Sequence, residues 1–527
     1  MEEKCPADER ILRLLKRGRR GFFGIVFSRT GLVTLALLVN ITLLAVLFVR
    51  FEQFLPHHWG ATAAFTAVMV LLLLATGIDA SAKVTWLILF MALPVVGALL
   101  FAYTQLDIGH RALKKRMQSL IDATRETLPQ NEPALAALAQ SCPGAAALAR
   151  YVDLAGCHPV HTGTAAAYYP GGEAKFAALC EALEQAERFI FLEYFIICEG
   201  QMWGRVLEIL ARKAAAGVEV RVLVDGSCEY TYLPASYPKQ LAKLGIRCKM
   251  FSPATPFIST HYNYRDHRKI VVIDGHTAFT GGINLSDEYI NIGSRFGHWK
   301  DVGIRLQGPA VRNFTLLFLQ MWNADIPKPD FGGYLDAPAP PQPEAPGWAM
   351  PFGDCPLDDE HVGELVYMDI LARAQRSVHI MTPYLILDGE LETALKYAAR
   401  RGVEVELILP GIPDKQIPYA LAKSHCAALL AAGVKIREYS PGFVHAKLMV
   451  ADGREAVIGS INLDYRSLYH HFECAAWLRD VPCIADMEAD FAKTKALCRT
   501  VTPQTLRAEP WWRKLLGFVM KGAAPLL

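Results

Sequence analysis

Two segments of this 527-residue chain carry the same residues at the same spacing. Each segment reads H-x-K-x4-D, followed by a Gly-Gly-x-Asn or Gly-Ser-x-Asn tail. The members are His267, Lys269, Asp274 and Asn284 in the first copy and His445, Lys447, Asp452 and Asn462 in the second. The offset is constant, because 445 − 267 and 462 − 284 both equal 178. A constant offset across four residue types indicates an internal duplication, so we expect two similar halves.

The residues between the lysine and the aspartate predict where the first motif lies in the fold. Ile270–Ile273 is a run of β-branched apolar residues, which is typical of a buried strand. Alternate residues of a strand share a face, so His267 and Lys269 are expected to point the same way. A single histidine beside a strand is more often a hydrogen-bonded core residue. Two matched copies favour a site in which imidazole and ammonium groups bind a phosphate.

The surrounding sequence predicts an α/β fold. The expected strands are Arg188–Ile197 and Val218–Val224 in the first half and Ser377–Leu387 and Val403–Leu409 in the second. The expected helices between them are Gly204–Ala216 and Glu390–Arg401. A strand–helix–strand order that occurs in both halves predicts a parallel or mixed sheet with helices on both faces.

Shifts in composition divide the chain into parts, since 527 residues are too many for one core. We expect a basic arm at 1–30, apolar segments within 31–105 and an Ala-rich helical stalk at 106–156. The two catalytic halves are expected at 157–326 and 352–500, joined by a stiff Pro-rich linker at 327–351. Residues 501–527 are expected to form an amphipathic C-terminal segment.

Three apolar stretches near the N-terminus are predicted to be membrane segments. They are Leu32–Val49, Trp59–Gly77 and Val84–Tyr103, each close to the ~20 residues that cross a bilayer as a helix. Basic clusters flank them at both ends, before residue 30 and at 111–116. The positive-inside rule assigns both flanks to the cytoplasm, whereas three crossings put them on opposite sides. The topology stays open, with a re-entrant segment as one solution.

The C-terminal stretch Pro510–Leu527 has two interpretations. Its tryptophans, Trp511 and Trp512, stand next to Arg513 and Lys514 and are followed by Leu, Phe and Val. Such a segment can be a helix packed on the core. It can equally be a helix that lies on lipid headgroups, where tryptophan and basic residues gather.

Charge and cysteine usage argue against several classes of protein. The formal net charge of +2 gives no global field that would attract nucleic acid. The 12 cysteines show neither C-x-x-C pairs nor regular spacing, which argues against a zinc site or a disulfide framework and indicates a reducing compartment. Cys180, Cys198 and Cys474 are expected to be small core residues.

The duplicated motif and its surroundings resemble the phospholipase D superfamily, whose mark is a duplicated H-x-K-x4-D motif. Within it, the chain is similar to the bacterial cardiolipin synthase family from about the third apolar stretch to the C-terminus. The supporting stretches are YRDHRKIVVIDG, FTGGINLSDEYIN, RFGHWKDVGIRLQGPAV, TPY at 382–384, GVEVELILPGIPD and GSINLDYRS. One departure is His471, where relatives commonly carry an asparagine next to Phe472. It affects one contact beside the site and not the chemistry.

The resemblance implies an architecture and a location. The fold would consist of two phospholipase D-like α/β/α repeats that form an intrachain pseudo-dimer, preceded by N-terminal transmembrane helices. The protein would be a multi-pass protein of the bacterial cell membrane. Its partners would be phosphatidylglycerol and membrane lipid, without nucleic acid.

Phosphodiester chemistry needs a nucleophile, a proton donor for the leaving alkoxide and cations for the phosphate oxygens. Two facing H-x-K motifs can supply all three. One imidazole would attack phosphorus, and the other would protonate the departing alcohol and deprotonate the incoming one. We assign His267 as the nucleophile and His445 as the acid–base group, since similar proteins often use the N-terminal histidine. The candidate phosphate-binding groups are Lys269, Lys447, Asn284, Asn462 and Ser460. No metal and no cofactor is expected.

Four acidic residues near the motifs receive two different roles. Asp274 and Asp452 complete the motifs and are therefore grouped with the catalytic residues, but each precedes a glycine. We therefore expect them to order a turn and pair with a basic neighbour rather than to carry protons. Asp301 and Glu473 each open an apolar strand that follows a motif. They are the candidates for orienting the catalytic rings, although a surface acid at a strand end would look the same.

Three classes of function follow from these residues. The resemblance implies a membrane-bound phosphatidyltransferase that makes cardiolipin from two phosphatidylglycerols, through a phosphatidyl-histidine, and releases glycerol. The alternative is a phospholipase D-type hydrolase, or a transferase that uses another alcohol or phospholipid, because only the acceptor differs. A nuclease would show a basic, aromatic groove. A non-catalytic membrane scaffold is disfavoured, because both histidines and both lysines are intact.

Overall fold

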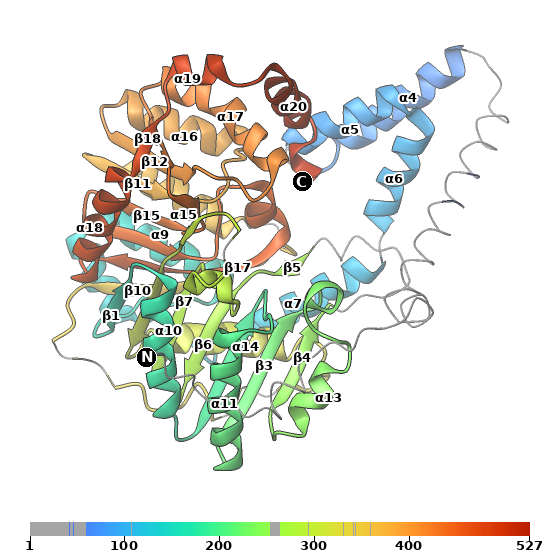
Figure 1. Ribbon diagram of the computed structural model, residues 1–527. Helices are drawn as coiled ribbons and strands as arrows, with labels where there is room; N and C mark the ends of the chain where they lie inside the picture. Colours follow the sequence, from blue (N-terminus) through green and yellow to red (C-terminus); the bar gives the residue numbers. More distant parts are fainter. Residues whose placement is uncertain are drawn as a thin grey trace.

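The computed structural model describes Thr42, Val46 and residues 59–526, except 79, 107, 253–263, 294, 330, 332, 341, 343 and 359. The expected basic arm at 1–30 lies outside the described residues, as does the apolar stretch 32–49 apart from Thr42 and Val46. Two α/β repeats form the main body, the first in green and the second in orange to red in Figure 1. Three helices near the N-terminus, in blue, project from it to one side.

The first repeat is built on a seven-stranded mixed sheet in the order β1-β9-β7-β6-β2-β3-β4. Its strands are β1 (Ala165–Tyr169), β2 (Phe189–Tyr194), β3 (Glu219–Asp225), β4 (Arg247–Phe251), β6 (Lys269–Ile273), β7 (Thr277–Gly281) and β9 (Gly303–Gln307). Its helices are α10 (Gly172–Glu184), α11 (Gln201–Ala215), α12 (Cys228–Thr231), α13 (Tyr237–Ala242), the 3-10 helix η2 (Asp287–Ile290) and α14 (Val311–Trp322). Strands β2, β3 and β4 run parallel, and the other neighbours are antiparallel.

The second repeat has the same sheet with one added edge strand. Its order, β10-β17-β16-β15-β11-β12-β13, matches the first sheet strand for strand and direction for direction, and β18 pairs beyond β13. The strands are β10 (Trp348–Asp354), β11 (Ser377–Met381), β12 (Glu404–Pro410), β13 (Lys435–Tyr439), β15 (Leu448–Ala451), β16 (Glu455–Gly459), β17 (His471–Arg479) and β18 (Cys498–Thr500). The predicted mixed α/β fold with two similar halves is confirmed.

Helices complete the second repeat and the C-terminus. They are α15 (Val362–Arg373), α16 (Gly389–Arg400), α17 (Gln416–Ala431), the π-helix η3 (Arg466–His470), α18 (Cys483–Ala496), α19 (Pro503–Ala508), α20 (Trp511–Lys521) and the 3-10 helix η4 (Ala524–Leu526). The largest hydrophobic core combines residues of both repeats around α14. The two repeats therefore share one core.

Short strands also join the two repeats. β5 (Arg265–Asp266) pairs in parallel with the start of β17, so that Asp266 lies opposite Phe472. β8 (His298–Lys300) pairs in parallel with β14 (Gly442–Val444), so that Lys300 lies opposite Val444. Each pairing brings the residue before a motif histidine to a strand of the opposite repeat.

The local predictions agree with the structure except at one strand end. The other predicted strands and helices agree to within a few residues, while β11 ends at Met381, earlier than the predicted Leu387. Pro383 has no N–H for a further strand pair, and this explains the early end. Cys474 is buried as predicted, whereas Cys180 and Cys198 are only half-buried.

The expected stalk and linker are instead parts of the main body. Helix α7 (Ile108–Thr124) packs Met117 and Leu120 into the core around α14. Helices α8 (Glu132–Ser141) and α9 (Pro143–Gly156) pack into the core of the second repeat, because their alanines allow close approach. In the Pro-rich stretch, Leu335 and Ala337 are buried, and β10 already begins at Trp348.

The expected third apolar segment is broken into two helices. Helix α4 (Trp59–Leu74) is followed by α5 (Ala80–Ala92) and α6 (Pro94–Leu106). The break lies at Pro94, which has no backbone N–H and favours the first position of a new helix. Phe101 of α6 packs edge-on against Trp86 and Phe90 of α5, with ring centroids 5.3 and 5.6 Å apart. Over the part of the chain that the structure describes, every helix is too short or too polar to cross a bilayer.

Candidate active site

Both motif histidines lie where a strand of one repeat meets a strand of the other. His267 separates β5 from β6, and its backbone N–H donates to the carbonyl of Phe472 at 3.0 Å. His445 follows β14, and its N–H donates to the carbonyl of Lys300 at 2.7 Å. Each of these carbonyls immediately precedes an acidic residue. Each histidine is therefore placed beside an acid of the opposite repeat.

The two acids accept hydrogen bonds from the rings. Nδ1 of His267 is 2.8 Å from Oε1 of Glu473, and Nδ1 of His445 is 2.7 Å from Oδ2 of Asp301. All four residues are buried. A carboxylate can only accept, so Nδ1 carries the proton in both rings and Nε2 keeps its lone pair. The predicted contact of each acid with a ring is present, and each pair is formed between the repeats.

Aromatic side chains surround both imidazoles. The ring of Phe195 lies 5.0 Å from that of His267, and the ring of Tyr289 lies 5.3 Å from that of His445, measured between centroids. Burial lowers the pKa of both histidines well below the usual range, and the ammonium group of Lys447 adds to this at His445. Burial therefore favours the neutral form of both rings.

The side chains of the two motif lysines lie beside the motif histidines. Lys269 and Lys447 each donate to the backbone carbonyl of their own motif histidine, and Nζ of Lys447 is 3.1 Å from Nε2 of His445. Burial lowers the pKa of Lys269 to about 8 and that of Lys447 to about 7. The charge of Lys269 also lowers the pKa of both Lys447 and His445. The groups of the two motifs are thus electrostatically coupled in one site.

The two acids have different surroundings. Ser460 donates a hydrogen bond to Oε2 of Glu473. The matched position in the first repeat is Gly282, where a Cβ would lie 2.2 Å from Oδ1 of Asp301, so only glycine leaves room for that carboxylate. Burial raises the pKa of Asp301 to about 6. Burial also acts on Glu473, but the adjacent imidazole rings outweigh it and hold its pKa well below the usual range.

The motif asparagines hold the segments that follow them. Asn284 donates to the hydroxyl of Tyr289 at 2.7 Å and accepts from the backbone N–H of Ile196 at 3.1 Å. Asn462 donates to the hydroxyl of Ser467 at 3.0 Å. In both repeats the side-chain partner lies five residues after the asparagine. These contacts give the asparagines a positioning role, and their contact with a phosphate stays a prediction.

The motif aspartates lie away from the imidazoles, and their inclusion with the catalytic groups is corrected. Asp274 accepts from three backbone N–H groups at 187–189, each at 2.8 Å, and Asp452 accepts from those at 375–377. Both have positive φ, at 53° and 56°, as the predicted turn requires. Asp274 follows the far end of β6, roughly 17 Å along the strand from Lys269 at 3.3 Å per residue. Asp274 anchors the start of the neighbouring strand β2 and Asp452 that of β11, which agrees with a structural role.

A third buried lysine, Lys175, was missed from the sequence. It is 1% exposed and passes over Gly303, where a Cβ would lie 2.5 Å from its Cδ. Burial lowers its pKa to about 8, and the charge of Asp301 opposes this. Among the residues that the structure describes, its Nζ has no hydrogen-bond partner. One lysine in the first turn of α10 carries no local signal that separates it from a surface residue.

His471, the departure from the family pattern, lies directly against the first dyad. Its ring centroid is 5.2 Å from that of His267, and its Nδ1 is 3.7 Å from Oε1 of Glu473. These three residues place one possible ligand atom each within 4.8 Å of one another. Two imidazoles and a carboxylate are ligand types that a metal can use, but the ammonium group of Lys269 in the same site disfavours a cation.

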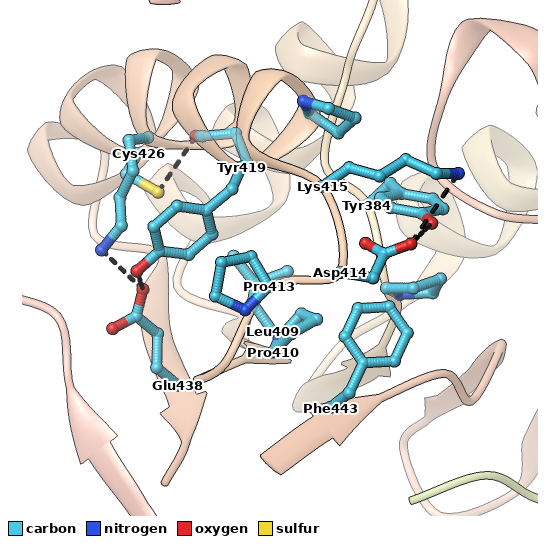
Figure 2. Close-up of a pocket in the computed structure, with 14 residues that line it drawn as sticks. Tyr384, Leu409, Pro410, Pro413, Asp414, Lys415, Tyr419, Cys426, Glu438 and Phe443 are labelled. Carbon is cyan, nitrogen blue, oxygen red and sulfur yellow. Dashed lines mark hydrogen bonds and ion pairs between the residues drawn. The ribbon is translucent and has the colours of Figure 1, made fainter. Parts of the chain in front are cut away.

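A narrow, mainly apolar pocket lies beside Phe443 of β14, the strand that precedes His445 (Figure 2). Phe443 lines it and also lies 6.0 Å from the ring of His445. Two polar groups on its wall are paired with each other, since Tyr384 donates to Asp414 at 2.7 Å. The pocket therefore offers apolar surface next to the second motif.

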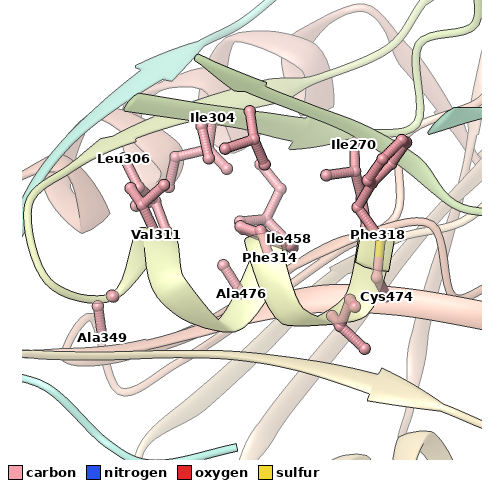
Figure 3. Packing of buried hydrophobic residues seen from close by; sticks show 14 of the residues in the cluster. Ile270, Ile304, Leu306, Val311, Phe314, Phe318, Ala349, Ile458, Cys474 and Ala476 are labelled. Carbon is pink, nitrogen blue, oxygen red and sulfur yellow. The ribbon is translucent and has the colours of Figure 1, made fainter. Parts of the chain in front are cut away.

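Helix α14 supports the site from the core. Figure 3 shows it between strands of the first sheet and strands of the second. The contacting side chains are Val311, Phe314 and Phe318 of the helix, Ile270, Ile304 and Leu306 of the first repeat, and Ile458, Cys474 and Ala476 of the second. Because β6 carries Lys269 and β17 carries Glu473, this packing fixes the spacing of the groups that form the site.

A family model and two named relatives that match this chain agree with one another on the family. The family described as cardiolipin synthase, PLD-like domain, matches residues 179–322 and 367–495, one segment in each repeat. The chain is 31% identical to the cardiolipin synthase of Alkalihalophilus pseudofirmus and 32% identical to that of Geobacillus kaustophilus, in each case over 84% of this chain and 88% of the relative. It is also 50% identical to an uncharacterized protein of Streptococcus mutans, over 87% of this chain and 99% of that protein.

One solved structure has the same fold over most of its length. It is the phosphatidylserine synthase of Haemophilus influenzae, with a TM-score of 0.55 and 14% identity. The match covers 69% of this chain and 95% of that structure. At this identity, the likeness concerns the fold alone.

Proposed function

This chain belongs to the cardiolipin synthase family of the phospholipase D superfamily and is a phosphatidyltransferase, and we propose that it joins two phosphatidylglycerol molecules into cardiolipin and releases glycerol. The observation that carries the proposal is the pair of crossed dyads, His267 with Glu473 and His445 with Asp301. A nucleophile and an acid–base group in one buried, cationic site suit transfer by two successive displacements.

In the first displacement, Nε2 of His267 attacks the phosphorus of the donor lipid. The bond between phosphorus and the oxygen of the headgroup glycerol breaks, and that oxygen takes a proton from Nε2 of His445. The bound phosphate anion raises the pKa of His445, so the ring can hold this proton before the step. The products are free glycerol and a phosphatidyl group bonded to His267.

In the second displacement, a glycerol hydroxyl of the acceptor lipid attacks the same phosphorus. Its proton passes to Nε2 of His445, the bond between phosphorus and His267 breaks, and cardiolipin leaves. The dyads favour this assignment of roles. Glu473 is firmly ionised and stabilises positive charge on His267, whereas Asp301, with a pKa of about 6, supports a ring that gains and loses protons.

The lysines would hold the phosphate oxygens during both steps. Lys269 and Lys447 are buried beside the rings, and Lys175 adds a third buried ammonium group next to Asp301. In such a site a cation stabilises developing negative charge more strongly than in water. These chain groups supply the charge that the reaction needs.

We also propose a bacterial cell membrane as the location, with the N-terminal apolar stretches as the multi-pass membrane part. The substrate class supports this, because both lipids reside in a bilayer. Side chains of the projecting helices support it too, since Leu71 is 66% exposed and Met91 is 77% exposed. The apolar stretch 32–49, most of which lies outside the described residues, would belong to the same membrane part.

The test supplies purified full-length protein with phosphatidylglycerol that carries one label in the acyl chain and a second in the headgroup glycerol. We expect acyl label in cardiolipin and one free labelled glycerol for each cardiolipin molecule formed. The double variant H267A/H445A, prepared in the same way, is the matched control and should give neither product. Phosphatidic acid as the main product would identify a hydrolase instead. Release of labelled glycerol that occurs only after another alcohol is added would identify that alcohol as the acceptor.

A further inference from the structure

Helix α20 presents its apolar side chains to the outside of the protein. Its five outward-facing apolar residues are Trp511 (74% exposed), Trp512 (44%), Leu515 (53%), Phe518 (77%) and Val519 (58%). Their spacing places them on one face of an α-helix, which we call the α20 stripe. A helix on the surface of a soluble domain normally turns such a stripe toward the core.

The opposite face of α20 is fixed to the second repeat. Gly517 is the buried residue of the helix, and a Cβ there would lie 2.4 Å from the backbone oxygen of Ala420 in α17. Arg513 is paired with Glu509 through a side-chain hydrogen bond. The orientation of the helix is therefore determined by packing, and the exposure of the stripe is a built feature of the fold.

Basic residues border the stripe. Lys514 and Lys521 are exposed and lie along one edge of it, three residues after Trp511 and Phe518 respectively. An apolar stripe with tryptophan at one end and lysine at its edge matches the layered chemistry of a bilayer surface, in which anionic headgroups lie above the acyl chains.

The stripe continues onto the N-terminal helices. The hydroxyl of Thr85 in α5 donates to the backbone oxygen of Gly522 at 2.8 Å, and Gly522 also approaches Ile88. Ile88 is 52% exposed and Met91 is 77% exposed. Figure 1 shows α20 next to the end of α5. Apolar surface from both ends of the chain is thus brought together.

The chain that follows α20 leads to the active site. Ala524 is buried against Tyr465, and the backbone oxygen of Pro525 accepts a hydrogen bond from His470 at 3.2 Å. His470 ends η3, and β17, which carries Glu473, begins at the next residue. A surface that orients α20 therefore also supports the segment that leads into the first dyad.

We propose that the α20 stripe, together with the exposed face of α5, is a docking surface for a bilayer of anionic phospholipid. It holds the second repeat against the membrane, so that the active site faces the layer that contains both lipids. This inference rests on the proposed function for the identity of the lipid, while the surface itself is defined by exposed residues of α20 and α5.

Tryptophan fluorescence tests the contact directly. Full-length protein is reconstituted into vesicles of phosphatidylglycerol and phosphatidylcholine with brominated acyl chains, and the same is done with the variant W511F/W512F. The emission of the wild type minus that of the variant, here called the difference emission, reports on the two α20 tryptophans among the nine of the chain. We expect bromine to quench this difference emission strongly. Unquenched difference emission would overturn the proposal.

Activity supplies the second measurement. The variant L515E/F518E should lose about tenfold or more in the rate on bilayer vesicles, since two apolar contacts with lipid are lost, but keep its rate on detergent micelles. The matched control is L154E/Y397E, because Leu154 and Tyr397 are 71% and 59% exposed on other helices. This control should keep the wild-type rate on both.

The possible failures are distinguishable. Quenching without cardiolipin formation would reject the proposed function and retain the docking surface. Cardiolipin formation without quenching would retain the proposed function and reject the docking surface. Unquenched emission together with a change of oligomeric state in L515E/F518E would identify the stripe as an interface between two copies of the chain, which also overturns the proposal.

Discussion

The imidazole of His267 is hydrogen-bonded to a carboxylate 206 positions later in the chain, with 2.8 Å between its Nδ1 and Oε1 of Glu473. The second dyad crosses in the opposite direction, from His445 to Asp301. Neither repeat contains a complete dyad of its own. The candidate active site is therefore formed jointly by the two repeats, which share the core around α14.

Loss of either acid should lower the rate and leave substrate binding nearly unchanged. In E473Q or D301N, the amide no longer fixes the Nδ1–H tautomer of its ring and cannot stabilise an imidazolium. We expect kcat to fall by about 10²- to 10⁴-fold at nearly constant KM. The double variant H267A/E473Q should be no slower than H267A, because the two residues act as a unit. Additive losses would contradict the crossed pairing.

The pH dependence of kcat/KM should be bell-shaped. Burial raises the pKa of Asp301 to about 6, so the acid that must accept from His445 becomes protonated as the pH falls through that value. Burial lowers the pKa of Lys447 to about 7 and that of Lys269 to about 8, so the phosphate-binding cations lose their charge as the pH rises. Activity should decline on both sides of neutrality, measured by initial rates in micelles. A flat profile would contradict these assignments.

Lys175 provides a sharper version of the same test. Its charge lowers the pKa of Asp301, so K175M should move the acidic limb to higher pH. The thermal midpoint should not fall, because Nζ has no hydrogen-bond partner among the described residues and methionine removes a buried charge. K239M, which removes an exposed charge on α13, is the control and should leave the limb in place.

Local sequence patterns were sufficient to locate the first motif strand and the strand–helix–strand unit of each repeat. The β-branched run at Ile270–Ile273 and the offset of 178 depend on neighbours and on spacing, both of which a sequence displays. The break at Pro94 was open to prediction as well, since a proline without an N–H ends a helix. The long apolar stretch around it masked this signal.

Other features depend on contacts that no local pattern encodes. The candidates Asp301 and Glu473 came from their predicted place at strand starts, but which ring each one meets depends on the β5–β17 and β8–β14 pairings between repeats. Lys175 enters the site from a helix about 90 positions before His267. The Ala-rich helices α8 and α9 looked like a stalk, because their small apolar faces reveal nothing of the core that covers them.

The motif aspartates should matter for stability and little for chemistry. D274A leaves three backbone N–H groups without their acceptor, which should cost about 2–4 kcal/mol of unfolding free energy and lower the thermal midpoint in detergent. The activity per folded molecule should stay close to wild type. D452A should cost less, because Asp452 and its partners are more exposed. A large fall in kcat for folded D274A would restore a catalytic role.

Chelators should leave the chemistry intact. His267, His471 and Glu473 have the spacing of a metal site, but the dyad already uses two of them and Lys269 adds positive charge. We expect the rate in micelles to be unchanged after EDTA treatment and dialysis. Loss of activity that one specific divalent metal restores, and that H471N abolishes, would show that this cluster binds a metal.

The last prediction concerns the covalent intermediate. Glu473 is ionised and held by Ser460, so it stabilises the positive charge that develops on His267 when its Nε2 bonds to phosphorus. With labelled phosphatidylglycerol and an alkaline detergent quench, label should appear on the peptide that contains His267. H445A should slow both the formation and the breakdown of this adduct without moving it, because the same ring protonates the leaving glycerol and deprotonates the acceptor. E473Q should lower the amount of adduct, since the charge on the ring is then unsupported. Label on the peptide Phe443–Lys447 would reverse the roles of the two histidines.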